Sequence, residues 1–191
     1  IRAVSAPLRV RIRSADATTL TNTTIAGNTL GTGATRNGQV GGVYAANFSV
    51  TLANSLLASN AGANCAGTIL DSGDNLSFPA SDTSCPVAFL SGDPHLGVLA
   101  NNGGSTDTMA LGFASAAIDQ VPTVAVGCSG TAQRGVPRPQ GPTCDIGAYE
   151  ADVLMAALTP ASPRSPSAPP TPPPLVPTRP ARPRPLPTRH H

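Results

Sequence analysis

The chain has 191 residues and a formal net charge of +2, which is the sum of two unlike parts. Residues 1–150 carry seven arginines against nine acids, whereas residues 151–191 carry five arginines, one acid and 13 of the 21 prolines. The first part lacks the basic surface typical of nucleic-acid binding, so no nucleic-acid partner is predicted. Aromatic residues make up 3% of the chain, and Gly, Asn, Thr and Ser separate short apolar runs. This composition favours many short strands over helices.

The first residues give two open interpretations. Residues 7–13, PLRVRIR, alternate apolar residues with arginine, which predicts a strand with a solvated arginine face. The same stretch would also fit a start that is not native sequence. The chain opens on Ile1 without a signal peptide, so we expect it to be the end of a longer secreted protein. The longest late apolar run, Val153–Leu158, is far shorter than the roughly 20 residues needed to span a membrane.

An internal repeat organises residues 1–90. The stretch LTNTTIAGN at residues 20–28 matches LANSLLASN at residues 52–60, and a looser copy, GTILDSGDNL, follows at residues 67–76. A strand of about five residues cannot bury its apolar face alone. Stacking successive copies about 4.8 Å apart pairs their backbones and closes one aliphatic core. The repeat therefore predicts about three stacked parallel coils, which is near the lower limit for a stable stack.

Asparagines recur at the same places in the two copies. Asn22 aligns with Asn54, and Asn28 aligns with Asn60. Asparagine tolerates the left-handed backbone conformation, so these positions fit ordinary turns. Asparagines stacked in register also form amide ladders, in which each side chain bonds to the next. Both interpretations remain open from the sequence.

Residues 93–120, DPHLGVLANNGGSTDTMALGFASAAIDQ, and residues 133–150, QRGVPRPQGPTCDIGAYE, carry the most specific pattern in the chain. They closely resemble the choice-of-anchor Q module, which ends many bacterial right-handed parallel β-helix surface proteins. The repeat copies upstream resemble the last coils of the same proteins. The resemblance implies export and attachment to the cell exterior. It also implies a module that caps the last coil, because an open sheet edge invites aggregation.

The chain departs from that family pattern at a few positions. Proline is usual where this chain has Val98, Ser105 and Ala116, and the loss of these prolines loosens the turns they would set. Aspartate is usual at Ala132, so a partner for Arg134 or Arg138 is lost. The remaining motif residues of the module are Asp93, Asp119 and Asp145. We expect Asp119 and Asp145 to bond backbone groups or Arg138.

Four cysteines, Cys65, Cys85, Cys128 and Cys144, allow three disulfide connectivities. Proximity in the sequence favours Cys65–Cys85 and Cys128–Cys144. Disulfide bonds of this kind are typical of proteins from oxidising compartments. No spacing of cysteine and histidine suggests zinc, and no metal or other cofactor is predicted.

No catalytic constellation is evident in the sequence. Asp71 and Asp74 lie in DSGDN, which is ordinary turn chemistry and fails the calcium-loop pattern. His95 is the only histidine before the tail, and a lone histidine is seldom a site. A β-helix enzyme would need paired carboxylates on neighbouring coils, with a base.

These patterns predict an all-β fold in three parts. The resemblance implies that residues 1–90 are the last coils of a right-handed parallel β-helix and that residues 91–150 are a choice-of-anchor Q-like C-terminal cap. Composition predicts that residues 151–191 are a disordered tail rich in proline and arginine. The favoured function is a secreted or cell-surface structural or adhesive protein, with extracellular polysaccharide or a host surface as partner. The alternative is the end of a polysaccharide lyase or glycoside hydrolase whose catalytic coils lie upstream.

Overall fold

The computed structural model describes residues 17–30 and 40–152, all within one compact unit, Ile1–Thr159. In these ranges the secondary structure is β-strand without helix, which confirms the all-β prediction. The predictions for residues 7–13 and for the proline-rich tail lie outside the described residues.

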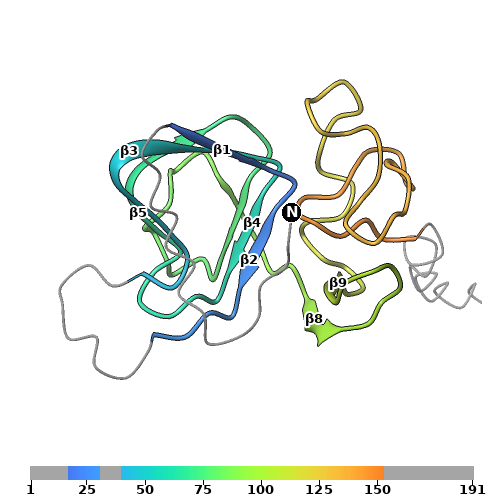
Figure 1. The fold of residues 1–191 in the computed structure, drawn as a ribbon, viewed down its shortest axis with the longest axis horizontal. Helices are drawn as coiled ribbons and strands as arrows, with labels where there is room; N and C mark the ends of the chain where they lie inside the picture. Colours follow the sequence, from blue (N-terminus) through green and yellow to red (C-terminus); the bar gives the residue numbers. More distant parts are fainter. Residues whose placement is uncertain (1–16, 31–39, 153–191) are drawn as a thin grey trace, which may run out of the picture. The chain divides into compact units, whose positions relative to one another are not determined.

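The strands form two parallel sheets and one antiparallel hairpin (Figure 1). The first sheet has the order β1 (Thr18–Thr21), β3 (Val43–Ala53), β5 (Cys65–Asp71). The second has the order β2 (Thr24–Ala26), β4 (Leu56–Ala58), β6 (Leu76–Phe78), β7 (Leu90–Ser91). The hairpin pairs β8 (Leu96–Ala100) with β9 (Thr108–Leu111). The chain thus alternates between the two parallel sheets in successive passes, β1–β2, then β3–β4, then β5–β6.

The register of these passes follows the sequence repeat. Leu20 pairs with Leu52 and Ile25 pairs with Leu57, so the strands pair the same positions that the repeat aligns. The looser third copy also pairs in parallel, because Val50 lies opposite Ile69. The step from β4 to β6 spans fewer residues than the step from β2 to β4, since Leu56 lies opposite Leu76 in the one and Thr24 lies opposite Leu56 in the other. The predicted stacking of three repeat copies is therefore confirmed.

The second sheet buries both of its faces. In β2 and β4 all three residues are buried, although side chains alternate between the two faces of a strand. Ile25 and Leu57 point into a cluster inside the stack, together with Val50, Leu52 and other aliphatic residues of the first sheet. Ala26, Ala58 and their same-face neighbours belong to a second cluster on the opposite face. Strands buried on both faces explain the nearly continuous apolar runs TIA and LLA.

Residues 91–150, which we call the C-terminal module, supply the other half of that second cluster. Leu111, Ala117, Val121 and Ile146 pack there with Leu56. The module therefore lies against the outer face of the β2–β4–β6 sheet, whereas the resemblance implied a cap on the last coil. The physical reason is the apolar outer face itself, which has to be covered along several passes. The interior cluster of the stack is completed instead by Phe89, which follows the third pass.

Both disulfides favoured by sequence proximity are present. Cys65, the first residue of β5, is bonded to Cys85 and closes a separation of 20 residues. Cys128 is bonded to Cys144 within the C-terminal module and closes a separation of 16 residues. The described chain contains no free cysteine. One disulfide thus ties the segment after the third pass to the stack, and the other ties two loops of the module together.

The asparagines form ladders between passes. The amide of Asn54 donates to Oδ1 of Asn22 at 3.1 Å, and the amide of Asn28 donates to Oδ1 of Asn60 at 2.8 Å. Asn60 in turn donates to Oδ1 of Asn64 at 2.8 Å. Asn22 and Asn54 also have left-handed backbones, with φ of 51° and 48°. The first column is therefore both a turn and a ladder.

The first column also fastens the C-terminal module. The amide of Asn22 donates to the carbonyl of Gly127 at 2.8 Å, and that of Asn54 donates to the carbonyl of Val126 at 2.6 Å. The backbone N–H groups of Gly147 and Ala148 donate to Asn54 O and to Oγ1 of Thr24. Two successive passes therefore hold the module by hydrogen bonds as well as by apolar packing.

Substitutions at Asn54 should separate its two roles. We expect Asn54→Ala to lower the free energy of unfolding by about 3 kcal/mol, because it removes two side-chain hydrogen bonds and because alanine tolerates the left-handed backbone less well than asparagine does. Asn54→Gly keeps the backbone conformation and should recover about 1 kcal/mol of that loss. Urea unfolding of the three proteins measures both effects. Equal stability of Asn54→Gly and the wild type would show that the ladder contributes nothing.

Candidate functional site

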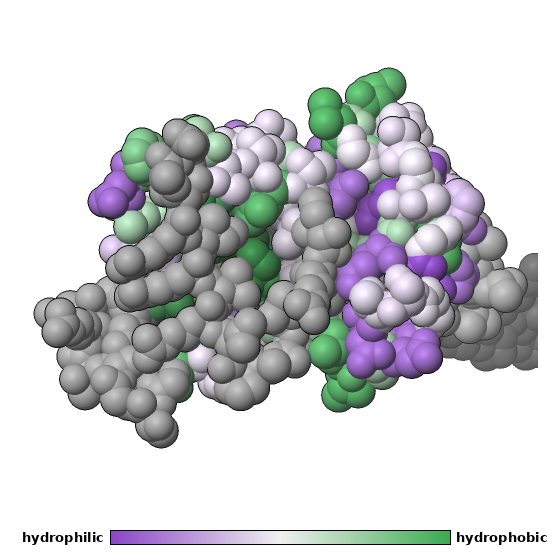
Figure 2. All heavy atoms as spheres, viewed as in Figure 1, coloured by the Kyte–Doolittle hydropathy of each residue, from purple (hydrophilic) through white to green (hydrophobic). Residues whose placement is uncertain are grey.

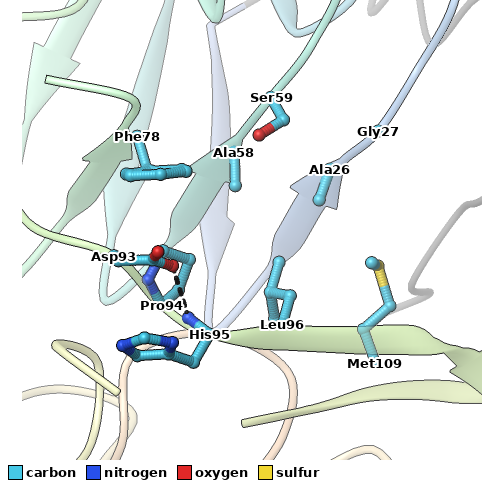
Figure 3. Close-up of a pocket in the computed structure, with 10 residues that line it drawn as sticks. All are labelled: Ala26, Gly27, Ala58, Ser59, Phe78, Asp93, Pro94, His95, Leu96 and Met109. Atoms are coloured by element: carbon cyan, nitrogen blue, oxygen red, sulfur yellow. Dashed lines mark hydrogen bonds between the residues drawn. The ribbon is translucent and has the colours of Figure 1, made fainter. Parts of the chain in front are cut away.

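A groove of about 470 Å³ opens beside the second sheet (Figure 3). One wall comes from the ends of β2, β4 and β6 and from the turns that follow, and the other comes from the turn before β8 and from β9. Ten residues line the groove: Ala26, Gly27, Ala58, Ser59, Phe78, Asp93, Pro94, His95, Leu96 and Met109. Its volume lies in the range of about 300–1,000 Å³ that is usual for small-molecule sites.

The groove combines an apolar base with a polar rim. Phe78, Leu96 and Met109 are half-buried and pack at the edge of the second apolar cluster. Ala26 and Ala58 carry small side chains, so they leave the sheet face open at this place. The exposed polar side chains at the rim are those of Ser59, Asp93 and His95. The groove can therefore take a ligand that has both an apolar face and hydrogen-bonding groups.

The rim is set by tight turns. The carboxylate of Asp93 accepts a hydrogen bond from the backbone N–H of His95 at 2.8 Å, which closes the turn before β8 (Figure 3). Three rim positions have left-handed backbones, Gly27 with φ of 65°, Ser59 with 53° and His95 with 45°. Ser59 and His95 adopt this conformation although they are not glycine. The turns thereby hold a hydroxyl and an imidazole at the mouth of the groove.

The other motif residues of the module gather away from this groove. Arg138 is the centre, and its Nη1 donates to Oε2 of Glu150 at 2.9 Å and to the carbonyl of Asp145 at 2.8 Å. Its Nη2 donates to the carbonyls of Gly147 and Tyr149. Both side chains of the Arg138–Glu150 pair are 1% exposed. Burial lowers the pKa of Arg138 and raises that of Glu150, and each charge partly opposes the effect of burial on its partner.

The two aspartates of the motif bond backbone groups, as expected. Asp145 accepts hydrogen bonds from the N–H groups of Asp119 at 2.9 Å and Ala151 at 2.6 Å. Asp119 accepts one from the N–H of Thr143 at 3.3 Å. Arg138 donates to the side-chain carboxylate of Glu150, whereas it contacts Asp145 only through the backbone carbonyl of that residue. The motif charges are therefore used to hold the loops of the module together.

Arg134 joins the same structure from its edge. Its Nη2 donates to the carbonyl of Glu150 at 2.8 Å and to Asp152 at 2.9 Å. Its guanidinium lies 4.4 Å from the ring centroid of Tyr149. The carboxyl-bearing side chain of Asp152 is half exposed, so this ion pair is a weak surface interaction.

The Asp145 carboxyl should make stability depend on pH. Burial raises the pKa of Asp145 to about 6 from an ordinary value of 3.8. Because the folded pKa is the higher one, the folded state holds this proton more tightly, and stability falls as pH rises from about 4 to about 6. The loss is on the order of 3 kcal/mol. Asp145→Asn cannot titrate. As pH rises through this window, urea unfolding should therefore show the wild type losing stability relative to the variant. A constant difference would contradict the shift.

The remaining acidic candidates are turn residues. Asp71 accepts hydrogen bonds from the N–H of Gly73 at 3.0 Å and from the amide of Asn75 at 2.6 Å. Asp74 has a left-handed backbone with φ of 52°. Partial burial raises its pKa, and the charge of Asp71 adds to the effect. Across residues 17–30 and 40–152, no group of three or more His, Cys, Asp or Glu side chains could hold a metal ion.

Exposed apolar residues of the described part form separate spots on the face shown in Figure 2. The most exposed large ones in the module are Val98, Val124 and Val126. Single exposed apolar residues are normal on protein surfaces and do not mark a docking face. The groove is therefore the stronger candidate for ligand binding.

Sequence reasoning named Asp93 and His95 but missed the other residues that matter. Ser59 occupies the repeat position that Gly27 holds in the preceding copy, and this replacement of glycine was a visible signal. Glu150 is the only glutamate of the chain and lies close to Arg134 and Arg138 in sequence. Phe78 and Met109 carried no signal, because only the packing of the module against the sheet brings them together.

Comparisons with protein-family models, with curated proteins and with solved structures found no match to this chain. Among the described residues there is no helix of the length and apolarity that crossing a membrane requires. The function must therefore be inferred from the geometry of the chain itself.

Proposed function

We propose that this chain is the C-terminal part of a secreted or cell-surface right-handed parallel β-helix protein, and that it serves as a structural or adhesive stalk. Residues 91–150 would be its choice-of-anchor Q-type module. The observation that carries the proposal is the pair of asparagine columns that connect successive parallel passes. Such columns stabilise an elongated stack and need no ligand.

A further asparagine feature supports more coils before this segment. The Oδ1 of Asn28, at the start of its column, is buried and has no hydrogen-bond partner among the described residues. A buried acceptor without a donor costs about 1–3 kcal/mol. An asparagine amide of a preceding coil, stacked on β2, would supply that donor.

The C-terminal module supports a structural role in the same way. Arg138, Glu150 and Asp145 are buried and bond to one another or to the backbone. Two disulfides are consistent with an extracellular location. An attached module of this kind strengthens a stalk, and these three charged residues hold its loops together.

The alternative is the end of a polysaccharide lyase or glycoside hydrolase. One observation favours it, the presence of Asp93 and His95 on the rim of one groove. A glycosidase uses a pair of carboxylates, and Asp93 is the one carboxylate among the described residues that line this groove. The structural and adhesive function is therefore the better supported one.

Surface exposure and activity of the native protein test the proposal together. Antibodies against residues 40–152 would follow the protein in intact producing cells treated with an external protease. We expect the signal to disappear, and the immunopurified protein to release no reducing ends or unsaturated uronates from polysaccharides. A protein that stays protected with reduced cysteines would overturn export. Steady release of sugar ends would overturn the structural function in favour of the enzyme.

A further inference from the structure

We propose that the groove between the second sheet and the β8 turn binds one or two units of a neutral saccharide. The proposal rests on the proposed extracellular function and names the ligand class and the site. It starts from the ten lining residues in Figure 3, which offer an apolar wall, a carboxylate, an imidazole and a hydroxyl.

The apolar wall fits the C–H face of a pyranose ring. Phe78 presents a half-buried ring beside Ala58, and Leu96 and Met109 line the facing side. An aromatic face carries partial negative charge, which attracts the slightly positive hydrogens of sugar C–H groups. The flat base left by Ala26 and Ala58 admits a ring lying on the sheet. A volume of about 470 Å³ leaves room for one or two such rings.

The polar rim selects hydroxyl groups over acids. Among the described residues that line the groove, Asp93 is the only carboxylate and arginine is absent. Its Oδ1 already accepts the N–H of His95, and a carboxylate has capacity for further donors. Hydroxyl groups are such donors, whereas a uronate would place a second negative charge beside Asp93. Charge complementarity therefore favours a neutral sugar over an acidic one.

Ser59 indicates that the rim is kept for binding at some expense to stability. Ser59 and Gly27 hold equivalent places after β4 and β2, and each donates its N–H to the next pass, to Phe78 O and to Ala58 O. Both have left-handed backbones, which suit glycine and strain serine. The first pass uses the unstrained residue. The second pass uses the strained one, which places a hydroxyl at the rim.

Binding of defined disaccharides to the full chain tests the proposal. The probes are cellobiose, N,N′-diacetylchitobiose and digalacturonic acid. Ligand-observed NMR detects their binding at ligand concentrations up to about 10 mM, at which a Kd near 1 mM is measurable. We expect a neutral disaccharide to bind and digalacturonic acid not to bind. Asp93→Asn keeps the turn acceptor but removes the charge, and should weaken neutral binding roughly tenfold.

Ser59→Gly gives the sharper test, because sugar binding should weaken without any loss of stability. Relief of strain should raise the thermal midpoint or leave it unchanged, while loss of the hydroxyl should weaken sugar binding roughly threefold to tenfold. Ser105→Gly, on an exposed loop outside the groove, is the matched control and should leave binding unchanged. If Ser59 only supported the fold, Ser59→Gly could weaken sugar binding only by also lowering stability.

The outcomes also separate this proposal from the proposed function. A folded chain that binds neither neutral disaccharide, or binds one equally well after both substitutions, overturns the saccharide site and leaves the structural function standing. Cleavage of a bound disaccharide overturns the structural function while keeping the site. Stronger binding of digalacturonic acid overturns the neutral ligand class.

Discussion

Replacing Arg138 by alanine should lower the free energy of unfolding by about 3–5 kcal/mol, because it leaves Glu150 as an uncompensated buried charge. The variant also leaves the carbonyls of Asp145, Gly147 and Tyr149 without their donor. We therefore expect the C-terminal module to lose its fold before the stacked passes do. Urea unfolding followed by circular dichroism, with hydrogen exchange to locate the loss, measures this effect.

Arg134→Ala is the matched control for that experiment. Arg134 belongs to the same motif, but its ion pair with Asp152 lies at the surface. Exposed pairs contribute about 0–1 kcal/mol, to which the contact with Tyr149 adds a similar amount. The control should therefore cost clearly less than Arg138→Ala. Equal losses in the two variants would show that the buried pair has no special weight.

Removing either disulfide should cost about 3 kcal/mol. The two bonds close separations of 20 and 16 residues, and loops of this length lose about that much chain entropy in the unfolded state. We expect Cys128→Ala/Cys144→Ala to loosen the module, and Cys65→Ala/Cys85→Ala to release the segment that carries Phe89. Thermal unfolding of each double variant, with and without reductant, measures the loss.

The reductant supplies the internal control. It should lower the thermal midpoint of the wild type more than that of either double variant, because each variant has one bond left to lose. A wild-type midpoint that does not respond to reductant would mean that the disulfides do not stabilise this fold. A response of only one double variant would assign the stabilisation to the bond that this variant retains.

The stacking could be predicted from the sequence because its signals are local and repeated. Leu20 and Leu52 head two similar stretches, and parallel pairing puts equal positions opposite each other. The columns of Asn22 with Asn54 and of Asn28 with Asn60 follow from the same register. The later passes, in which Leu76 pairs first with Leu56 and then with Leu90, share too few side chains for the sequence alone to set their register.

The groove and the place of the module could not be predicted in this way. Met109 and Ala26 meet in the groove although they lie far apart in the sequence, and no repeat relates their segments. The partner of Arg138 was not predicted either, because the sequence pattern offered only Asp119 and Asp145. Burial of the whole network, and not spacing, selects Glu150. The apolar triplets TIA and LLA are consistent with a sheet covered on both faces, but they do not say which segment covers the outer one.

The attachment of the module to the first two passes affects how the protein would carry a mechanical load. A pull applied beyond Asp152 reaches the stack through Gly147 and Ala148, whose N–H groups bond to Asn54 and Thr24. Through these two hydrogen bonds the force would enter the stack at its first and second passes. Glu150 lies on this path, and its buried pair with Arg138 would share the load before it reaches the two bonds to the stack.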